Sequence, residues 1–144
     1  MEWLNQYIGV PYRSRGRSFR GADCFGIMAL IYQHELGIKI PEFNYTSAKD
    51  VRGNAPIISR EKRCWNQVSE SEISAFDVVL FNITGVEAHI GVLVDSTKKL
   101  VIHTLAEHDS ALIRLDSAQW NRRVAGFYRH NDFFQTAFFQ ARSS

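Results

Sequence analysis

Hydrophobic residues recur at helical spacing in the first half of the chain. Residues 2–8 carry apolar side chains on one helical face, and the first nine positions of residues 24–36 are almost wholly apolar. Asp23 is a good N-cap for the second of these helices, and Gly37 is a good C-cap. Because a helix that is apolar on all sides is buried, residues 24–36 predict a central helix in the core.

The spacing changes to that of β-strands in the second half. Five short runs rich in β-branched residues, separated by turn residues, lie at 77–83, 88–94, 99–104, 111–116 and 124–130. Helices followed by a meander of strands predict an α+β fold, in which the central helix packs on a five-stranded antiparallel sheet.

Residues 42–64, between these halves, are polar and irregular and include Gly53 and Pro56. They predict a long surface segment with one or two helical turns. No linker divides the chain, so we expect a single domain over residues 1–130. Residues 131–144 are a Phe-rich extension, which we expect either to close onto its own domain as a helix or to dock onto a partner protein.

Charge and composition narrow the function. The 144 residues include 17 basic and 15 acidic side chains, a net charge of +2 that is too balanced to predict nucleic-acid binding. No apolar run reaches the roughly 18 residues of a transmembrane helix, and the N-terminus lacks the apolar core of a signal peptide. We therefore expect synthesis in the cytoplasm without an export signal. Cys24 and Cys64 are too few for a disulfide framework; we expect them reduced, with a single bridge as the alternative.

Cys24 is the first candidate for chemistry. If Asp23 caps the central helix, Cys24 is the first residue of that helix and lies near unpaired backbone N–H groups and the positive end of the helix dipole. Both features favour the thiolate. A nucleophile is one interpretation, and a buried structural cysteine is the other.

A thiolate nucleophile needs a base, and the base needs a group that orients it. His89 and His103 lie in neighbouring predicted strands. A hairpin about Ser96 and Thr97 places position 89 roughly opposite position 103 or 104, which is close enough for a hydrogen bond between the rings. The alternative for each is a histidine satisfied within the core.

Two other uses of polar residues compete with this interpretation. Zinc sites take three or four ligands, often in short paired spacings, which Cys24, His89 and His103 do not have; we expect no metal and no other cofactor. The arginines at 13, 15, 17 and 20 suit the binding of a carboxylate or phosphate, and the alternative is a solvated loop.

Five short motifs together resemble the NlpC-like family of cell-wall cysteine peptidases, which have a papain-related α+β fold. They are GVPY at 9–12, GADCFG at 21–26, DVVLF at 77–81, HIGV at 89–92 and VIHT at 101–104. Their order and spacing fit the family from Trp3 to about His130, which is nearly the whole chain.

The resemblance implies roles for five residues. Cys24 is the nucleophile, His89 the general base and His103 the orienting third member. Tyr12 and Asp23 bind substrate, Tyr12 through its hydroxyl at the substrate or the oxyanion and Asp23 at the substrate's amine end. The implied reaction is hydrolysis of an amide in the peptide stem of bacterial peptidoglycan, usually between D-glutamate and the diamino acid.

Departures from the usual motifs resemble the phage-tail branch of the family. Phe25 stands where many members have Ser, and Ala75-Phe76-Asp77 stands where Pro-Gly-Asp is usual. With no export signal, this branch implies delivery to the cell wall or periplasm by a phage tail or a contractile secretion system, or residence in a virion. The Phe-rich extension would then contact tail or secretion-system proteins, and a toxin effector is a further context. The alternatives are a catalytically idle tail-assembly module and an acyltransferase or thioesterase on the same fold.

Overall fold

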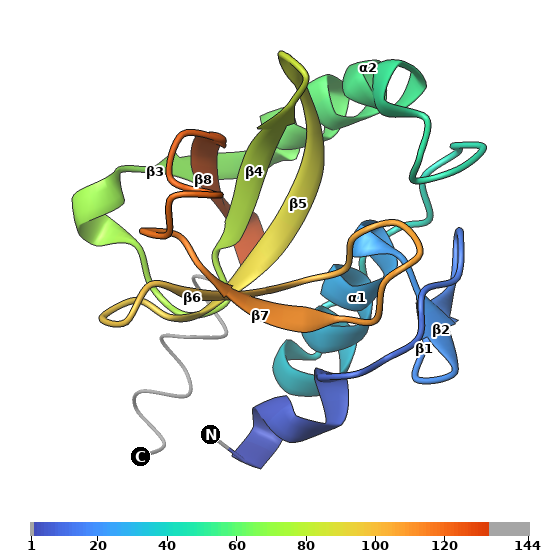
Figure 1. The fold of residues 1–144 in the computed structure, drawn as a ribbon, viewed down its shortest axis with the longest axis horizontal. Coiled ribbons are helices and arrows are strands. Elements are labelled where there is room, and N and C mark those ends of the chain that lie inside the picture. The colour runs from blue at the N-terminus through green and yellow to red at the C-terminus, as the bar shows by residue number, and fades with distance from the viewer. Residues whose placement is uncertain (1, 133–144) are drawn as a thin grey trace.

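Helices in the first half of the chain precede a curved sheet in the second half (Figure 1). The structure is a computed structural model and describes residues 2–132. The helical elements are η1 (Glu2–Tyr7), α1 (Cys24–Ile31), η2 (Tyr32–Leu36), α2 (Val51–Glu61), η3 (Lys62–Cys64) and η4 (Glu70–Glu72). No helix in this range is long and apolar enough to cross a bilayer.

The main sheet has six antiparallel strands in the order β3-β8-β4-β5-β6-β7. Their bounds are β3 (Trp65–Val68), β4 (Val78–Ile83), β5 (Val86–Asp95), β6 (Leu100–His103), β7 (Ala111–Arg114) and β8 (Val124–His130). β6 and β7 cross the direction of β4 and β5 steeply, so the sheet is strongly coiled (Figure 1). A separate hairpin, β1 (Arg17–Ser18) and β2 (Gly21–Ala22), lies in the arginine-rich loop.

The five predicted strands are all present, but the expected count of five was wrong. The sixth strand, β3, lies at the sheet edge and pairs with β8, with Trp65 opposite His130 and Val68 opposite Phe127. Its four residues lack the alternation of a half-buried strand. β3 exists because a distant part of the chain offers it a partner, and a local pattern does not reveal that.

α1 is the buried helix that the apolar run predicted, since all eight of its residues are buried. The helix does not continue regularly to residue 36, because Tyr32–Leu36 form a π-helical turn. Gly37 then ends it with a φ of +67°, the left-handed conformation that glycine adopts at little cost. The first predicted helix is a 3₁₀ helix, and Ile8, assigned to its apolar face, is exposed.

α2 corrects the prediction of an irregular segment at 42–64. This helix has 11 residues, begins after the N-cap Asp50 and contains Pro56. Ile58 and Asn54 are buried on its inner side, and α2 lies along β5 at one end of the sheet (Figure 1). Packing against the sheet therefore overrides the poor helix propensity of Gly53 and Pro56.

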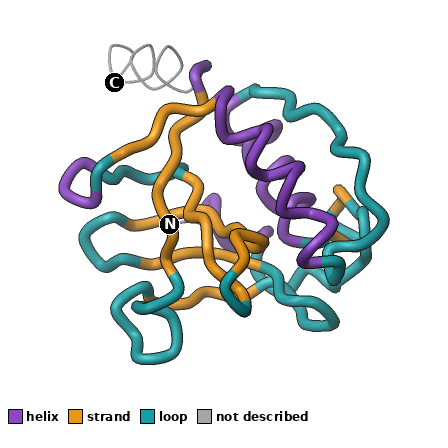
Figure 2. The backbone as a smooth tube through the Cα atoms, turned by 90° about the horizontal axis from the view of Figure 1, so that it is seen from above, coloured by secondary structure: helices purple, strands orange, loops and turns teal. Residues whose placement is uncertain are grey.

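Apolar side chains fill both faces of the sheet. Ile90 and Val92 of β5 face the larger cluster, which contains α1. Leu93 faces a smaller cluster with Phe81 and Trp120. Seen from above, the strands gather on one side of the molecule and the long helix runs along the other (Figure 2). The Phe-rich positions of the predicted extension, 133–144, lie outside the described residues.

Candidate active site

Cys24 is held at the first position of α1. The Gly26 N–H donates to Asp23 Oδ1 over 2.8 Å, so Asp23 is the N-cap that the sequence predicts. A Cβ added at Gly26 would lie 1.7 Å from the Gly16 oxygen, which shows how closely the arginine-rich loop packs on this turn. Cys24 is a free thiol with 3% of its surface exposed.

His89 on β5 and His103 on β6 contact each other through their rings. His89 Nε2 lies 2.9 Å from His103 Nδ1, and both side chains are buried. The predicted contact is present although the register differs, because Gly91 rather than position 89 is opposite His103. Gly91 allows the strands to approach, since a Cβ there would lie 2.5 Å from Val101 Cγ1.

The backbone of β5 connects the thiol to the histidine pair. The Ile90 N–H hydrogen bonds to the Cys24 sulfur, and Ile90 directly follows His89. β6 pairs with β5 only from Gly91 onward, so α1 meets β5 where that ladder stops. Within residues 2–132 the sulfur makes no hydrogen bond to either imidazole. The fold thus brings Cys24 to the residue next to His89 and leaves the thiol–imidazole contact open.

Burial sets the protonation state of the thiol. Desolvation, with a smaller contribution from the Asp23 charge, raises the pKa of Cys24 to about 12. Hydrogen bonds from the backbone N–H groups of Ile90, Phe25 and Cys24 lower it, but by less. The expectation that the helix N-terminus produces a thiolate was therefore wrong for this closed arrangement, because the cost of burying a charge exceeds the gain from the N–H groups.

The two imidazoles are neutral for the same reason. Burial, with a smaller contribution from His103, lowers the pKa of His89 to about 3. Burial also lowers the pKa of His103 to about 4. A neutral imidazole carries one N–H and one lone pair, so the ring that donates in this pair keeps its other nitrogen as a base.

Asp23, the chain neighbour of Cys24, and Tyr12, whose backbone forms a bridge with Ala22, have different environments. Asp23 Oδ2 accepts hydrogen bonds from the Arg15 N–H at 2.8 Å and the Tyr45 hydroxyl at 2.6 Å, and the side chain is fully buried. The Tyr12 hydroxyl is also buried but has no hydrogen-bond partner in the described chain. An unsatisfied buried hydroxyl is unusual and is suited to a ligand.

A segment after α1 covers the site; we call residues 40–50 the strap. Arg17 donates to the Ile40 and Pro41 carbonyl oxygens, each over 2.8 Å. Further along, Tyr45 donates to Asp23, and Lys49 pairs with Glu107 at 2.5 Å. The strap is therefore attached at three places: to Arg17 of the arginine-rich loop, to Asp23 just after that loop, and to Glu107.

The strap also places aromatic rings over the start of α1. The Phe25 ring centroid lies 5.7 Å from that of Phe43 and 5.1 Å from that of Tyr45. Arg17 and Arg15 lie over the rings of Phe43 and Tyr45, respectively. Two of the four clustered arginines therefore hold the strap. Sequence analysis missed Tyr45, for which the available signal was an aromatic residue within a polar segment.

Residues 9–129 match the NlpC/P60 family. The chain belongs to that family. It is 20% identical over 123 residues to an Escherichia coli protein named murein DD-endopeptidase MepS/murein LD-carboxypeptidase, covering 85% of this chain and 57% of that protein. The chain thus spans little more than half the length of this curated relative.

Solved NlpC/P60 structures share the fold. A Bacillus cereus family protein superposes with a TM-score of 0.63 at 24% identity, covering 86% of this chain and 36% of that one. The NlpC/P60 domain of the peptidoglycan hydrolase SagA superposes with a TM-score of 0.59 at 21% identity, covering 88% of this chain and 91% of that domain.

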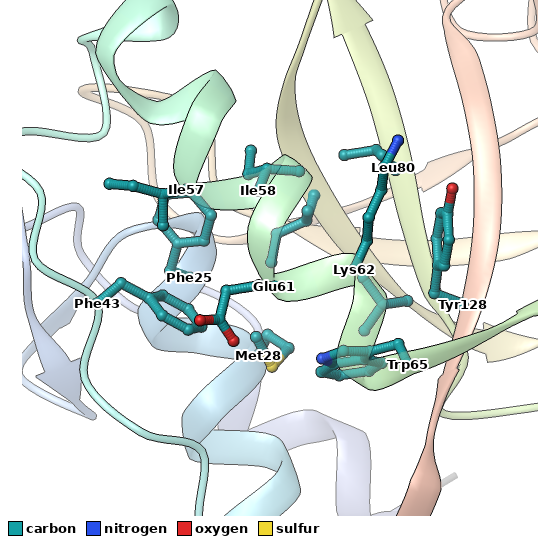
Figure 3. Close-up of a pocket in the computed structure, with 12 residues that line it drawn as sticks. Phe25, Met28, Phe43, Ile57, Ile58, Glu61, Lys62, Trp65, Leu80 and Tyr128 are labelled. Atoms are coloured by element: carbon teal, nitrogen blue, oxygen red, sulfur yellow. The ribbon is translucent and has the colours of Figure 1, made fainter.

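An apolar cavity of about 60 Å³ lies beside α1 in this NlpC/P60 domain. Phe25, Met28 and Phe43 gather on one side of it, and Trp65 and Tyr128 lie on the other (Figure 3). Phe25 and Ile90, which line the cavity, are the chain neighbours of Cys24 and His89. The exposed lining is almost entirely apolar although Glu61 and Lys62 border it, so the space suits an alkyl group better than a charged one.

The other histidines of the domain take no part in this arrangement. His34 is exposed and lies against Phe19, with ring centroids 5.4 Å apart. His108 is exposed, and His130 packs edge-on against Trp65. Within residues 2–132, no group of three or more His, Cys, Asp and Glu side chains is arranged to hold a metal ion.

Proposed function

We propose that this NlpC/P60 domain is a cysteine peptidase that hydrolyses an amide bond in the peptide stem of bacterial peptidoglycan. The observation that carries the proposal is the bond between His89 and His103 beside the helix terminus that bears Cys24. The murein endopeptidase name of the E. coli relative supports the substrate class.

The hydrogen bond between the imidazoles suggests how the base is oriented. When His89 Nε2 donates to His103 Nδ1, His89 Nδ1 keeps its lone pair and is the nitrogen left for the thiol. His89 then takes the Cys24 proton as the sulfur attacks the substrate carbonyl carbon, and the new imidazolium gives that proton to the leaving amine. Water, deprotonated by His89, hydrolyses the thioester and restores the thiol.

The oxyanion of the tetrahedral intermediate needs donors at the start of α1. The backbone N–H of Cys24 is one, because first-turn N–H groups have no partner within the helix. The unpartnered Tyr12 hydroxyl is a second candidate donor. Asp23 receives the substrate's amine end in this proposal, which requires Tyr45 to give up its hydrogen bond to that carboxylate.

Substrate entry in this proposal displaces the strap, since Cys24 is only 3% exposed while the strap is closed. Opening of the strap would expose the sulfur to water, and the dipoles of the bound peptide would then replace Phe43 and Tyr45, both of which lower the cost of forming a thiolate. The bond cleaved is proposed to be the one between D-glutamate and the diamino acid, with the arginine-rich loop at the stem carboxylates.

The test is replacement of Cys24 by Ala. Muropeptide cleavage, followed by mass spectrometry of the digest, is expected to fall by roughly a thousandfold or more, while the circular dichroism spectrum stays unchanged. The matched control is His108→Ala, an exposed histidine whose loss is expected to leave cleavage unchanged. Turnover retained in the Cys24→Ala protein would exclude the proposal, and an inactive wild type would favour an idle assembly module.

Acyl transfer or thioester hydrolysis is the second candidate, and the apolar cavity beside Phe25 favours it. It uses the same nucleophile and base but a fatty acyl substrate. Cys24-dependent hydrolysis of p-nitrophenyl octanoate without muropeptide cleavage would support this reading over the peptidase.

Delivery by a phage tail or contractile secretion system, with docking through the Phe-rich extension, is part of the proposal. Deleting residues 131–144 is expected to abolish incorporation into such a particle and to leave muropeptide cleavage in solution unchanged. Unchanged incorporation would contradict the docking role.

A further inference from the structure

Trp120 lies against both rings of the histidine pair. Its ring centroid is 5.0 Å from that of His103, with the ring planes at 89°, and 6.1 Å from that of His89. Phe81 is 5.5 Å from His89 and 5.1 Å from Trp120. Two aromatic rings, Phe81 from β4 and Trp120 from the β7–β8 connection, therefore pack against the hydrogen-bonded imidazoles of β5 and β6.

Trp120 is itself fixed in place. Its backbone N–H donates to the Ser117 oxygen at 3.1 Å, and its carbonyl accepts from the Arg123 N–H at 3.0 Å. The Arg123 guanidinium lies over the indole, 5.4 Å from its centroid. Trp120 is only 3% exposed, so its indole packs against the pair within the core.

We propose that Trp120 is a positioning residue for the histidine pair, which holds the His103 ring edge-on and keeps water from the hydrogen bond between His89 and His103. The expected effect on kcat rests on the proposed function, whereas the effect on the orientation and titration of the histidines does not. Without the indole, water competes for His103 Nδ1, and His89 is no longer restricted to the ring orientation that presents Nδ1 to Cys24.

The neighbours of His89 and His103 determine the pKa values of the two imidazoles. His89 faces His103 and Phe81, and the Cys24 thiol of α1 lies beside the next residue along β5. The Arg123 cation packs on the Trp120 indole. The lowered pKa of His103 is caused by burial, and that of His89 by burial and then by His103. Removing the indole admits water and raises both toward the ordinary value of about 6.5.

The test compares Trp120→Ala and Trp120→Phe, with Trp3→Ala as the control because Trp3 packs on Tyr7 and Phe76 instead. Histidine titration is followed by NMR on ¹⁵N-labelled protein, and kcat and KM on muropeptide. In Trp120→Ala we expect His89 and His103 to titrate at higher pH, the acidic limb of kcat to move to higher pH, and kcat to fall about tenfold to a hundredfold with KM unchanged. Trp120→Phe is expected to keep histidine titrations and a kcat close to those of the wild type.

The outcomes separate this inference from the proposed function. If the wild type shows no turnover but the two titrations still move in Trp120→Ala, the peptidase assignment fails and the positioning role stands. Unchanged titration of both histidines in folded Trp120→Ala would overturn the inference, as would the same shift in Trp3→Ala. Should Trp120→Ala not fold, Trp120→Leu and Trp3→Ala carry the test; a shift of the two histidine titrations in the first with none in the second supports it, and no shift in the first overturns it.

Discussion

At the scale of single residues, desolvation decides the chemistry of the site. Cys24 has the helix terminus that favours a thiolate, yet its burial raises its pKa to about 12. His89 and His103 have lowered pKa values because the same core excludes water from both. The resting pair in this structure is a neutral thiol and a neutral base, so proton transfer must accompany attack or follow an opening of the site.

The histidine pair makes stability depend on pH. The unfolded chain protonates these histidines near 6.5, whereas the folded chain does so only near 3 and 4. The unfolded state therefore binds more protons between these values, and the free energy of unfolding falls as the pH is lowered from about 6.5 toward 4. We expect the free energy of unfolding, measured with urea at several pH values, to change less steeply with pH in His103→Asn than in wild type.

The control for this dependence is His108→Asn, which removes an exposed histidine and is expected to keep the wild-type slope. Equal slopes in the two variants would contradict the assignment of the pH dependence to the buried pair.

At the scale of elements, the strap and the first turn of α1 form one packed unit. Arg17 is the clearest link, because it donates two hydrogen bonds to backbone carbonyl oxygens of the strap and lies over Phe43. Asp23 is the second link, since it caps α1 and accepts from Tyr45. Opening the strap therefore need not unfold α1, because the cap bond to Gly26 is separate from the strap contacts.

Arg17→Ala is expected to increase exposure of the thiol. Losing two hydrogen bonds to neutral carbonyls, each contributing roughly 0.5–1.5 kcal/mol, raises the open fraction roughly fivefold to a hundredfold. Alkylation of Cys24 by iodoacetamide, measured by peptide mass spectrometry, is expected to speed up by a similar factor. Arg20→Ala, an exposed arginine in the same loop, serves as the control; equal rates in both variants would refute the role of the strap.

Close packing between the arginine-rich loop and α1 predicts a cost for a single methyl group. Gly26→Ala places a Cβ 1.7 Å from a backbone oxygen, so backbone must move, and we expect a loss of about 1–3 kcal/mol in the free energy of unfolding. Gly126→Ala is the matched control, because its Cβ meets the outer edge of the Tyr128 ring at 3.1 Å. A loss in Gly26→Ala no larger than in the control would show that the loop yields easily.

At the scale of the whole molecule, a buried ion pair connects the start of β4 to β8. Arg129 Nε and Nη2 donate to the two oxygens of Asp77 at 2.7 and 2.8 Å, and Asp77 is fully buried. Asp77 also accepts from the Ser74 N–H at 2.8 Å. The pair ties the residue before β4 to β8, its neighbour in the sheet, so we interpret its role as structural.

Arg129→Met is expected to lower the free energy of unfolding by about 3 kcal/mol, because it leaves the Asp77 carboxylate buried without its cation. Chemical denaturation measures this, and below the transition the rate of Cys24 alkylation is expected to match wild type. The comparison is Arg114→Ala, which breaks the exposed pair with Asp116 and is expected to cost little. Similar losses of unfolding free energy in the two variants would contradict the claim that burial makes the Asp77–Arg129 pair more important than an exposed pair.

Much of the fold and the core of the site followed from local patterns. The Asp23 cap, the Gly37 terminus, the buried helix and the five strands depend on residues three or four apart, or on alternation along one strand, which a sequence displays directly. The same alternation and one turn sufficed to predict the contact between His89 and His103.

Other features depend on parts of the chain that meet only after folding. β3 needs β8, α2 needs the sheet, and Trp120 meets the histidines from a polar turn. The thiol's pKa departs furthest from expectation, because desolvation adds up over every group that surrounds the sulfur, including the distant strap. Capping and periodicity are short-range effects along the chain, so the caps, the buried helix and the five strands were predictable from the residues. Burial is a property of the assembled core, so β3, α2, the Trp120 contact and the pKa of the thiol were decided only by the tertiary packing.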